Sequence, residues 1–258
     1  MKLQPHIKIS SKQISPYVLL PGDPARVDTI GTYLYNFTIL ANSREFRVGI
    51  GTFRGKRITV CSTGIGCPST AIAVEELINA GAKYLIRVGT CGGAWRTDIR
   101  AGSLIIPTAS IRDEGTTTEY IPQGFPAVAD FDIVNELVRS AKKEKIKYSV
   151  GINRTHDAFY GTREAITKWG KYMQDERWKN SETPILSSEM ESAVLFVIAS
   201  LRNVKAGAVF AVNSNPEPLK ERVLGNDISV ITESNEKISK QIIDPMIRIA
   251  LEAILKLP

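Results

Sequence analysis

The stretch RITVCSTGIGCPSTAIAVEELINAGAKYLIRVGT (residues 57–90) carries the pattern that decides the fold. The apolar run Arg57–Ser62 predicts a buried strand, and Tyr84–Val88 predicts a second one. Between them, Ser69–Ala80 is typical of a helix, because apolar residues recur at helical spacing, a proline stands at the start and a glycine follows the end. A strand, a helix and a strand in this order are typical of an α/β domain.

The same alternation continues along the rest of the chain. Further strands are predicted at Tyr17–Pro21, Arg47–Phe53 (a hairpin with the strand at Arg57), Ser103–Ile111, Tyr148–Ile152 and Ala206–Val212. Further helices are predicted at Phe131–Glu144, Glu189–Arg202 and Asn235–Leu257, the last with a kink at Pro245. Residues 153–187 are polar and less regular. Since no linker or repeat interrupts the pattern, we expect one domain over residues 1–258, with three α/β/α layers around one central sheet.

The composition excludes several classes of protein. The chain has 258 residues, of which 43% are apolar and 23% charged, which is typical of a globular protein and not of disorder or a disulfide scaffold. No apolar run reaches the roughly 18 residues that span a bilayer, and the N-terminus lacks a signal-peptide core, so we expect a cytoplasmic protein. Three cysteines without metal-ligand spacing predict buried thiols, and two histidines are too few for a zinc site.

The net charge of +6 could indicate nucleic-acid binding. However, the basic residues are scattered, and the densest run, at residues 142–147, has no aromatic residues interleaved with its lysines to stack on bases. We therefore expect neither a nucleic-acid partner nor a membrane partner.

Small and basic residues follow three of the predicted strands. Gly22-Asp23-Pro24-Ala25-Arg26 follows the first, residues 63–69 follow the strand at Arg57, and Arg87 precedes Gly89-Thr90 at the end of another. In α/β sheets, ligands bind at the carboxyl ends of strands, where bare amides, helix starts and arginine forks attract phosphate. Taken singly, the first motif could be only a turn and Arg87 could pair with a structural carboxylate. Together they predict a site for a small oxyanion.

Two other motifs have a competing structural explanation. Gly64–Ser69 nearly fits the dinucleotide fingerprint, but the acidic residue expected about 20 positions later is absent, which disfavours NAD and favours plain phosphate. Ser188-Glu189-Met190-Glu191 fits a helix capping box, or a pair of carboxylates that holds sugar hydroxyls. His6, near the chain terminus, is by default a solvated surface residue.

Residues 61–92 strongly resemble the core of the hexameric-type nucleoside phosphorylases, in particular the uridine phosphorylases. The same family's other signatures resemble PGDPARV (21–27), NSREF (42–46), FPAVADFD (125–132), DAFY (157–160) and SSEMESA (187–193), in the same order. The resemblance implies a central mixed, partly barrel-like sheet and a pentosyltransferase that uses inorganic phosphate and no organic cofactor. It also implies a homo-hexamer, a trimer of dimers, whose sites are shared between subunits.

The resemblance assigns roles to individual residues. Phosphate would be bound by Gly22, Arg26, Arg87 and Thr90, with Arg44 from a neighbouring subunit. Ribose would be bound by Met190 and Glu191, with His6 from a neighbour at the 5′-hydroxyl. Arg87, Glu191 and Thr90 would act directly in catalysis, and Phe159 would lie against the base or the sugar. A potassium ion would lie near Glu45, Ile65 and Ser69.

The base-binding residues depart from the family pattern. Uridine phosphorylases carry a Gln-x-Arg pair after the Phe-Tyr motif, whereas this chain has no Gln there, and Arg163 fits only if the loop is shortened. Purine enzymes carry an Asp where this chain has Asn213-Ser214. The overall similarity favours uridine as substrate, with base contacts from Phe159, Arg163, Asn213 and Ser214. The alternatives are purine nucleosides (inosine, guanosine or adenosine), a broad specificity, or a nucleoside-binding protein without catalysis.

Overall fold

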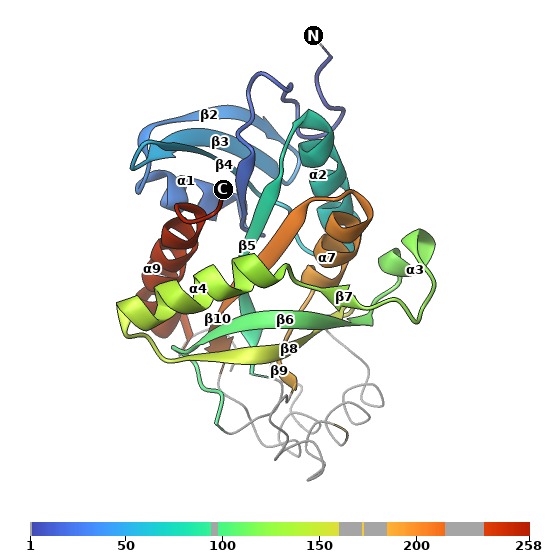
Figure 1. Cartoon of the computed structure of the whole chain (residues 1–258), viewed down its shortest axis with the longest axis vertical. Coiled ribbons are helices and arrows are strands. Elements are labelled where there is room, and N and C mark those ends of the chain that lie inside the picture. The colour runs from blue at the N-terminus through green and yellow to red at the C-terminus, as the bar shows by residue number, and fades with distance from the viewer. Residues whose placement is uncertain (1, 94–97, 160–171, 173–184, 215–234) are drawn as a thin grey trace.

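The computed structural model describes residues 2–93, 98–159, 172, 185–214 and 235–258, which form ten strands in one sheet with helices around it (Figure 1). The strands are β1 (Tyr17–Leu20), β2 (Tyr35–Ser43), β3 (Phe46–Phe53), β4 (Lys56–Cys61), β5 (Tyr84–Gly92), β6 (Leu104–Asp113), β7 (Ala127–Val128), β8 (Tyr148–His156), β9 (Ile185–Glu189) and β10 (Lys205–Ser214). The helices are α1 (Pro24–Gly31), α2 (Cys67–Ala80), α3 (Thr116–Tyr120), α4 (Phe131–Glu144), α7 (Ser192–Leu201) and α9 (Asn235–Ile254).

Part of the sheet closes on itself. β10 pairs with β6, β6 with β8, β8 with β9, β9 with β5, and β5 again with β10, which completes a ring. From β5 the sheet continues outward through β1, β4, β3 and β2, with both parallel and antiparallel pairs. The expected mixed, partly barrel-like sheet is therefore confirmed. Because β4, β1 and β5 are parallel neighbours, their carboxyl ends meet at one edge.

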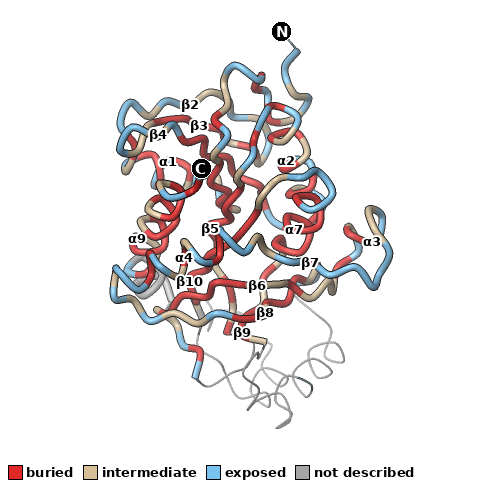
Figure 2. Tube along the Cα trace, viewed as in Figure 1, coloured by how far each residue is buried: buried red, intermediate tan, exposed pale blue. Residues whose placement is uncertain are grey.

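Helices cover both faces of the sheet. One apolar core lies between the sheet and helices α2 and α7, and a second lies between the sheet and helices α1, α4 and α9 (Figures 1 and 2). Helix α7 is the most enclosed, because its residues Ser192–Ala199 are all buried. The predicted three layers are confirmed, and Cys61, Cys67 and Cys91 are free and buried as expected. None of the described helices has the length and apolar character needed to cross a membrane.

Most predicted elements are present, with several differences. The hairpin β3–β4 turns at Arg54 and Gly55, which both have the positive φ that a two-residue hairpin loop requires. Residues 153–156 were predicted to be irregular, but they continue strand β8, because each of them pairs with β6. Strand β2 was not predicted, since its residues are mostly exposed or half-buried and lack a clear apolar alternation.

Gly207 permits close packing of β10 against helix α4. A Cβ atom at this position would lie 2.3 Å from Cγ2 of Ile133. We expect Gly207→Ala to lower the free energy of unfolding by about 1–3 kcal/mol, the usual cost of overpacking a core. Urea denaturation measures the change. Gly124→Ala is the control, because a Cβ at Gly124 would have no atom within 4 Å, and an equal loss in both variants would contradict the explanation.

Candidate active site

The site begins where β1 ends and helix α1 begins. Asp23 caps the helix, because its Oδ1 accepts a hydrogen bond of 2.9 Å from the amide of Ala25, and Pro24 occupies the first turn. The Gly22-Asp23-Pro24 motif is therefore a helix start and not an isolated turn. It places Arg26, which is half-buried, on the first turn of α1 beside the end of β5.

Arg87 lies at the centre of the site. Its side chain is almost fully buried: Nε donates to Oε2 of Glu189 at 3.0 Å, and Nη2 donates to Oε2 of Glu191. Nη1 is also buried but has no hydrogen-bond partner among the described residues, and it lies 3.8 Å from where a Cβ of Gly22 would be. A buried charged donor without a partner costs several kcal/mol. Arg87 therefore has both a structural carboxylate partner and one arm left for a ligand.

A second guanidinium lies close to the first. Nη1 of Arg26 donates a long hydrogen bond of 3.4 Å to the carbonyl of Val88. Burial lowers the pKa of Arg26, Asp23 opposes this, and the positive charge of Arg87 lowers it further. Two cations that repel each other at one strand edge form a site that an anion would stabilise. The structure therefore brings together Gly22, Arg26 and Arg87. Thr90, half-buried, lies three residues beyond Arg87 on the same strand, and its contact with phosphate stays a prediction.

Glu189 is held by a dense network of hydrogen bonds. Its Oε1 accepts from the side chains of Asn153 (2.8 Å), Thr155 (2.7 Å) and Ser192 (2.7 Å). Although burial raises the pKa of Glu189, the Arg87 charge and the hydrogen bonds from Thr155 and Ser192 outweigh it, and the net pKa is lowered. Glu189 is thus a fixed anion that orients Arg87. The sequence pattern predicted no separate role for it.

Glu191 is the less satisfied carboxylate. Its Oε1 accepts a hydrogen bond of 2.7 Å from the amide of Gly66, at the N-terminus of helix α2, where the helix dipole favours an anion. Burial raises the pKa of Glu191, Arg87 opposes this, and the neighbouring charge of Glu189 raises it again, so that the net pKa is raised. Glu191 is therefore the carboxylate that a ligand can recruit most easily.

The capping-box interpretation of residues 188–191 is wrong. Ser188 belongs to strand β9, and helix α7 begins only at Ser192. The side chain of Glu191 makes no capping bond, and the amide of Ser192 instead donates to the carboxylate of Glu189 at 3.0 Å. Both carboxylates contact Arg87, so the alternative, in which carboxylates hold sugar hydroxyls, stays a prediction and applies to Glu191.

The raised pKa of Glu191 has a consequence for stability. A carboxyl whose pKa is higher in the folded state than in the unfolded state stabilises the fold fully below the unfolded pKa, and this contribution is lost as pH rises through the folded pKa. We expect Glu191→Gln, which mimics the protonated side chain, to be at least as stable as the wild type at pH 7. The difference should shrink as pH falls through the raised pKa of Glu191 and vanish below about 4. Urea unfolding at several pH values tests this, and a strongly destabilised variant at pH 7 would contradict it.

A second group of predicted residues lies on the surface beside the loop at Gly64. Ser69 Oγ donates to Oε1 of Glu45 at 2.7 Å, and Glu45 lies against Gly64, where a Cβ would be 2.6 Å from its Cγ. The pKa of Glu45 is lowered first by a hydrogen bond from its own backbone amide, then by the Ser69 hydroxyl, and further by nearby Arg44 and, when it is protonated, His6. Arg44 and His6, which are expected to reach the site of a neighbouring subunit, therefore lie close to Glu45 and Ser69, which are expected near potassium. Ile65, on the same loop, is 77% exposed.

The residues predicted to bind the base lie at the ends of β8 and β10. The ring of Phe159 is 60% exposed, and Asn213 lies at a bulge, because Val212 pairs with Cys91 while Ser214 pairs with Gly92. Bulges commonly redirect a side chain near active sites. Met190, half-buried, follows β9. Arg163 lies outside the described residues.

Comparison with known proteins identifies the family. A model of the phosphorylase superfamily matches residues 16–248. The chain belongs to the phosphorylase superfamily. It is 42% identical over 211 residues to a uridine phosphorylase of Treponema pallidum, with 81% of each chain covered, and 34% identical over 257 residues to a guanosine phosphorylase of Halorubrum lacusprofundi, with 100% of each covered. The crystal structure of a Vibrio fischeri uridine phosphorylase matches with a TM-score of 0.86 and 33% identity, over 100% of this chain and 99% of that one.

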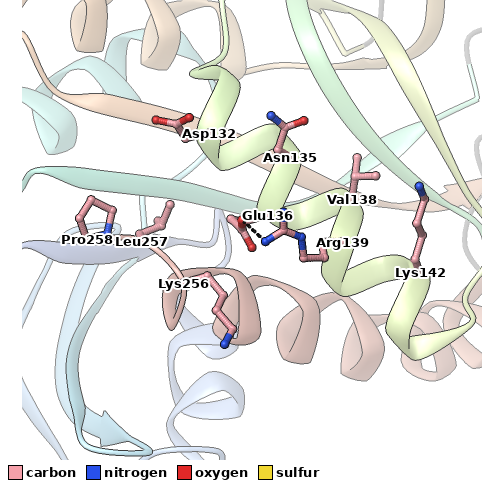
Figure 3. Close-up of a pocket in the computed structure, with 9 residues that line it drawn as sticks. All are labelled: Asp132, Asn135, Glu136, Val138, Arg139, Lys142, Lys256, Leu257 and Pro258. Carbon is pink, nitrogen blue, oxygen red and sulfur yellow. Dashed lines mark hydrogen bonds and ion pairs between the residues drawn. The ribbon is translucent and has the colours of Figure 1, made fainter.

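A surface pocket and a small group of potential metal ligands lie outside the site of this phosphorylase. A pocket of about 640 Å³ lies between helix α4 and the residues after α9. In this pocket Arg139 turns toward Glu136 (Figure 3). None of the predicted site residues that the structure describes lines it.

Cys67, Glu114 and Asp157 have ligand atoms within 4.8 Å of one another. However, burial raises the pKa of the Cys67 thiol, and the protonated sulfur donates to the carbonyl of Met190, so this group is a poor metal site.

Proposed function

We propose that the protein catalyses the phosphorolysis of uridine to uracil and ribose 1-phosphate. A phosphate oxygen attacks C1′, the bond between C1′ and the base breaks, and the base leaves with the electron pair and takes up a proton. The observation that carries this proposal is the buried Nη1 of Arg87, which has no hydrogen-bond partner in the described part of the chain and lies beside Gly22 and the guanidinium of Arg26. The related uridine phosphorylases support it.

In this proposal the two substrates bind side by side. Arg26, Arg87 and Thr90 hold phosphate below C1′, and Glu191 and Met190 hold the ribose. As the bond to the base breaks, positive charge grows on the ribose, and the phosphate anion both attacks and stabilises it. Fixing the two reactants in line removes an entropic barrier that reaches about 7–11 kcal/mol in favourable cases. None of these steps requires a covalent bond to the protein.

The surface group around Glu45 supports a shared site. We propose that Arg44 and His6 reach the phosphate and the 5′-hydroxyl of a neighbouring subunit within a hexamer. The Glu45 carboxylate and the Ser69 hydroxyl are hard oxygen donors, which fit a potassium ion between subunits. Light scattering with and without potassium tests the assembly, and a monomer that is fully active would contradict the shared site.

Purine nucleosides are the second candidate substrates. The related guanosine phosphorylase matches over the whole of both chains, and the amide of Asn213 offers both a donor and an acceptor to a 6-oxopurine or to uracil. A panel of uridine, inosine, guanosine and adenosine, each with and without phosphate, decides between them. We expect base release only with phosphate, and fastest from uridine. Release without phosphate would indicate a hydrolase, and tight binding without product would indicate a nucleoside-binding protein.

Arg44 offers a prediction that separates function from stability. It forms the turn between β2 and β3 with φ of 56°, a left-handed conformation that asparagine adopts more readily than arginine. We expect Arg44→Asn to keep or raise the free energy of unfolding, by up to about 1 kcal/mol. The KM for phosphate should rise about 10- to 100-fold, the effect of losing one charged hydrogen bond.

The matched control is Lys145→Asn. Lys145 also has φ of 56°, at the C-cap of helix α4, and it belongs to neither group of site residues. Its substitution should affect stability in the same direction and leave the phosphate KM unchanged. An unchanged phosphate KM in the Arg44 variant would exclude a role for Arg44 in phosphate binding.

A further inference from the structure

Glu76, on helix α2, holds the N-terminal segment of the chain through His6. Its Oε2 accepts hydrogen bonds of 2.9 Å from the backbone amides of His6 and Ile7, and its Oε1 lies 2.6 Å from Nδ1 of the His6 ring. Only 9% of the Glu76 side chain is exposed, whereas 41% of the His6 side chain is exposed. One buried carboxylate thus fixes both the backbone and the ring of a surface histidine.

This contact determines which ring nitrogen of His6 carries the proton. A carboxylate only accepts hydrogen bonds, so Nδ1 must donate to Glu76. In the neutral ring, Nε2 then carries the free lone pair and acts as an acceptor. The ring also packs edge-on against Phe46, with centroids 6.4 Å apart and an interplanar angle of 74°, which limits its rotation.

We propose that Glu76 is a positioning residue, which fixes the orientation and tautomer in which His6 accepts a hydrogen bond from the nucleoside 5′-hydroxyl. This inference rests on the proposed function, in which His6 meets the nucleoside of a neighbouring subunit. The hydrogen bonds from the two backbone amides hold the segment without involving the ring. The additional bond to Nδ1 acts on the chemistry of the ring, in the way that a carboxylate behind a metal-bound histidine sets its tautomer.

The variant Glu76→Gln separates these roles. The amide oxygen of glutamine can still accept from the two backbone amides, but its NH₂ group would face Nδ1 and donate to it. The proton of the neutral ring would then move to Nε2, which would change from an acceptor to a donor. Glu75→Gln is the matched control, because Glu75 is the adjacent residue of the same helix and pairs with Arg202 on the surface.

The experiment compares kcat/KM for uridine and for 5′-deoxyuridine, which lacks the hydroxyl. We expect the wild type and Glu75→Gln to prefer uridine, and Glu76→Gln to reduce this preference about five- to tenfold, the contribution of one hydrogen bond. In a His6→Ala background, Glu76→Gln should leave the preference unchanged. An equal loss on both substrates would overturn the proposal and leave Glu76 a purely structural residue.

A second readout does not depend on activity. The chain has only two histidines, so ¹⁵N NMR of the imidazoles can be assigned through His6→Ala. We expect a protonated Nδ1 at His6 in the wild type and a protonated Nε2 in Glu76→Gln; an unchanged tautomer would overturn the proposal. If Glu76→Gln does not fold, Glu76→Asp, which keeps the charge but is one methylene shorter, should show the same loss of preference.

The same experiments distinguish failure of the proposed phosphorolysis from failure of the positioning role of Glu76. In that case the wild type would release no base from any nucleoside with phosphate, although the His6 tautomer could still be observed. Normal phosphorolysis with an unaltered preference in Glu76→Gln would reject the positioning role alone.

Discussion

Replacing Arg87 with alanine should lower kcat/KM for phosphorolysis by about three orders of magnitude, as expected when a preorganised charged donor at the reacting group is lost. The substitution removes the arm that faces Gly22 and the cation that neutralises Glu189 and Glu191. Nucleoside binding should survive in part. Because a buried ion pair is broken, the free energy of unfolding should also fall by about 3–5 kcal/mol. Steady-state kinetics with varied phosphate and urea denaturation measure the two effects.

Arg87→Lys keeps the charge and therefore tests the geometry of the site. Lysine is a single point charge, so it cannot contact Glu189, Glu191 and phosphate with three separate nitrogen atoms. We expect this variant to fold, to bind nucleoside and to show a phosphate KM about 10- to 100-fold above that of the wild type. If its phosphate KM were normal, phosphate would have to bind elsewhere, and the proposed site would be wrong even if the alanine variant failed to fold.

Glu191→Gln should lower kcat/KM for nucleosides about 100-fold without loss of fold. The carboxylate is expected to accept from the 2′- and 3′-hydroxyls, and each charged hydrogen bond contributes about 1.5–3 kcal/mol. The glutamine oxygen can still accept from Gly66, and helix α7 keeps its cap because Glu189 supplies it. Kinetics with uridine and 2′-deoxyuridine should show that the variant discriminates less between them.

Ser188→Ala is the control for this variant. A capping box would require Ser188 for the stability of α7, but it lies in strand β9, so its substitution should change neither stability nor activity appreciably. Unchanged kinetics in Glu191→Gln would remove Glu191 from the ribose site.

The sequence was most informative where one segment determines its own structure. Helix α2 and strand β5 were predicted closely, because a strong apolar pattern is bounded there by Pro68 and Gly81, and Gly81 has φ of 124°. The start of α1 was interpreted as a turn, although Asp23 followed by Pro24 is a capping signal that could have revealed it. The motif indicates a helix start only when it is considered together with the helix that follows it.

The role of Glu189 could not be read from local pattern in the same way. Its partners come from β5, β8 and the start of α7, and residues so distant in sequence meet only when the barrel closes. The same holds for Glu76, which in the sequence is one more residue of an amphipathic helix and gains its partners only when the N-terminal segment folds back on it. The candidate phosphate residues were found because each follows a strand, and the topology brings strand ends together.

The ion pair between Arg87 and Glu191 links the two halves of the site. An anion bound at Nη1 shares the positive charge of Arg87 with Glu191, which weakens this ion pair and leaves that carboxylate a better acceptor for hydroxyl groups. By thermodynamic reciprocity, occupancy of the sugar subsite must favour the anion to the same extent. We therefore expect positive heterotropic cooperativity, in which saturating phosphate tightens the dissociation constant of the nucleoside, with the single bond between two side chains as its physical origin.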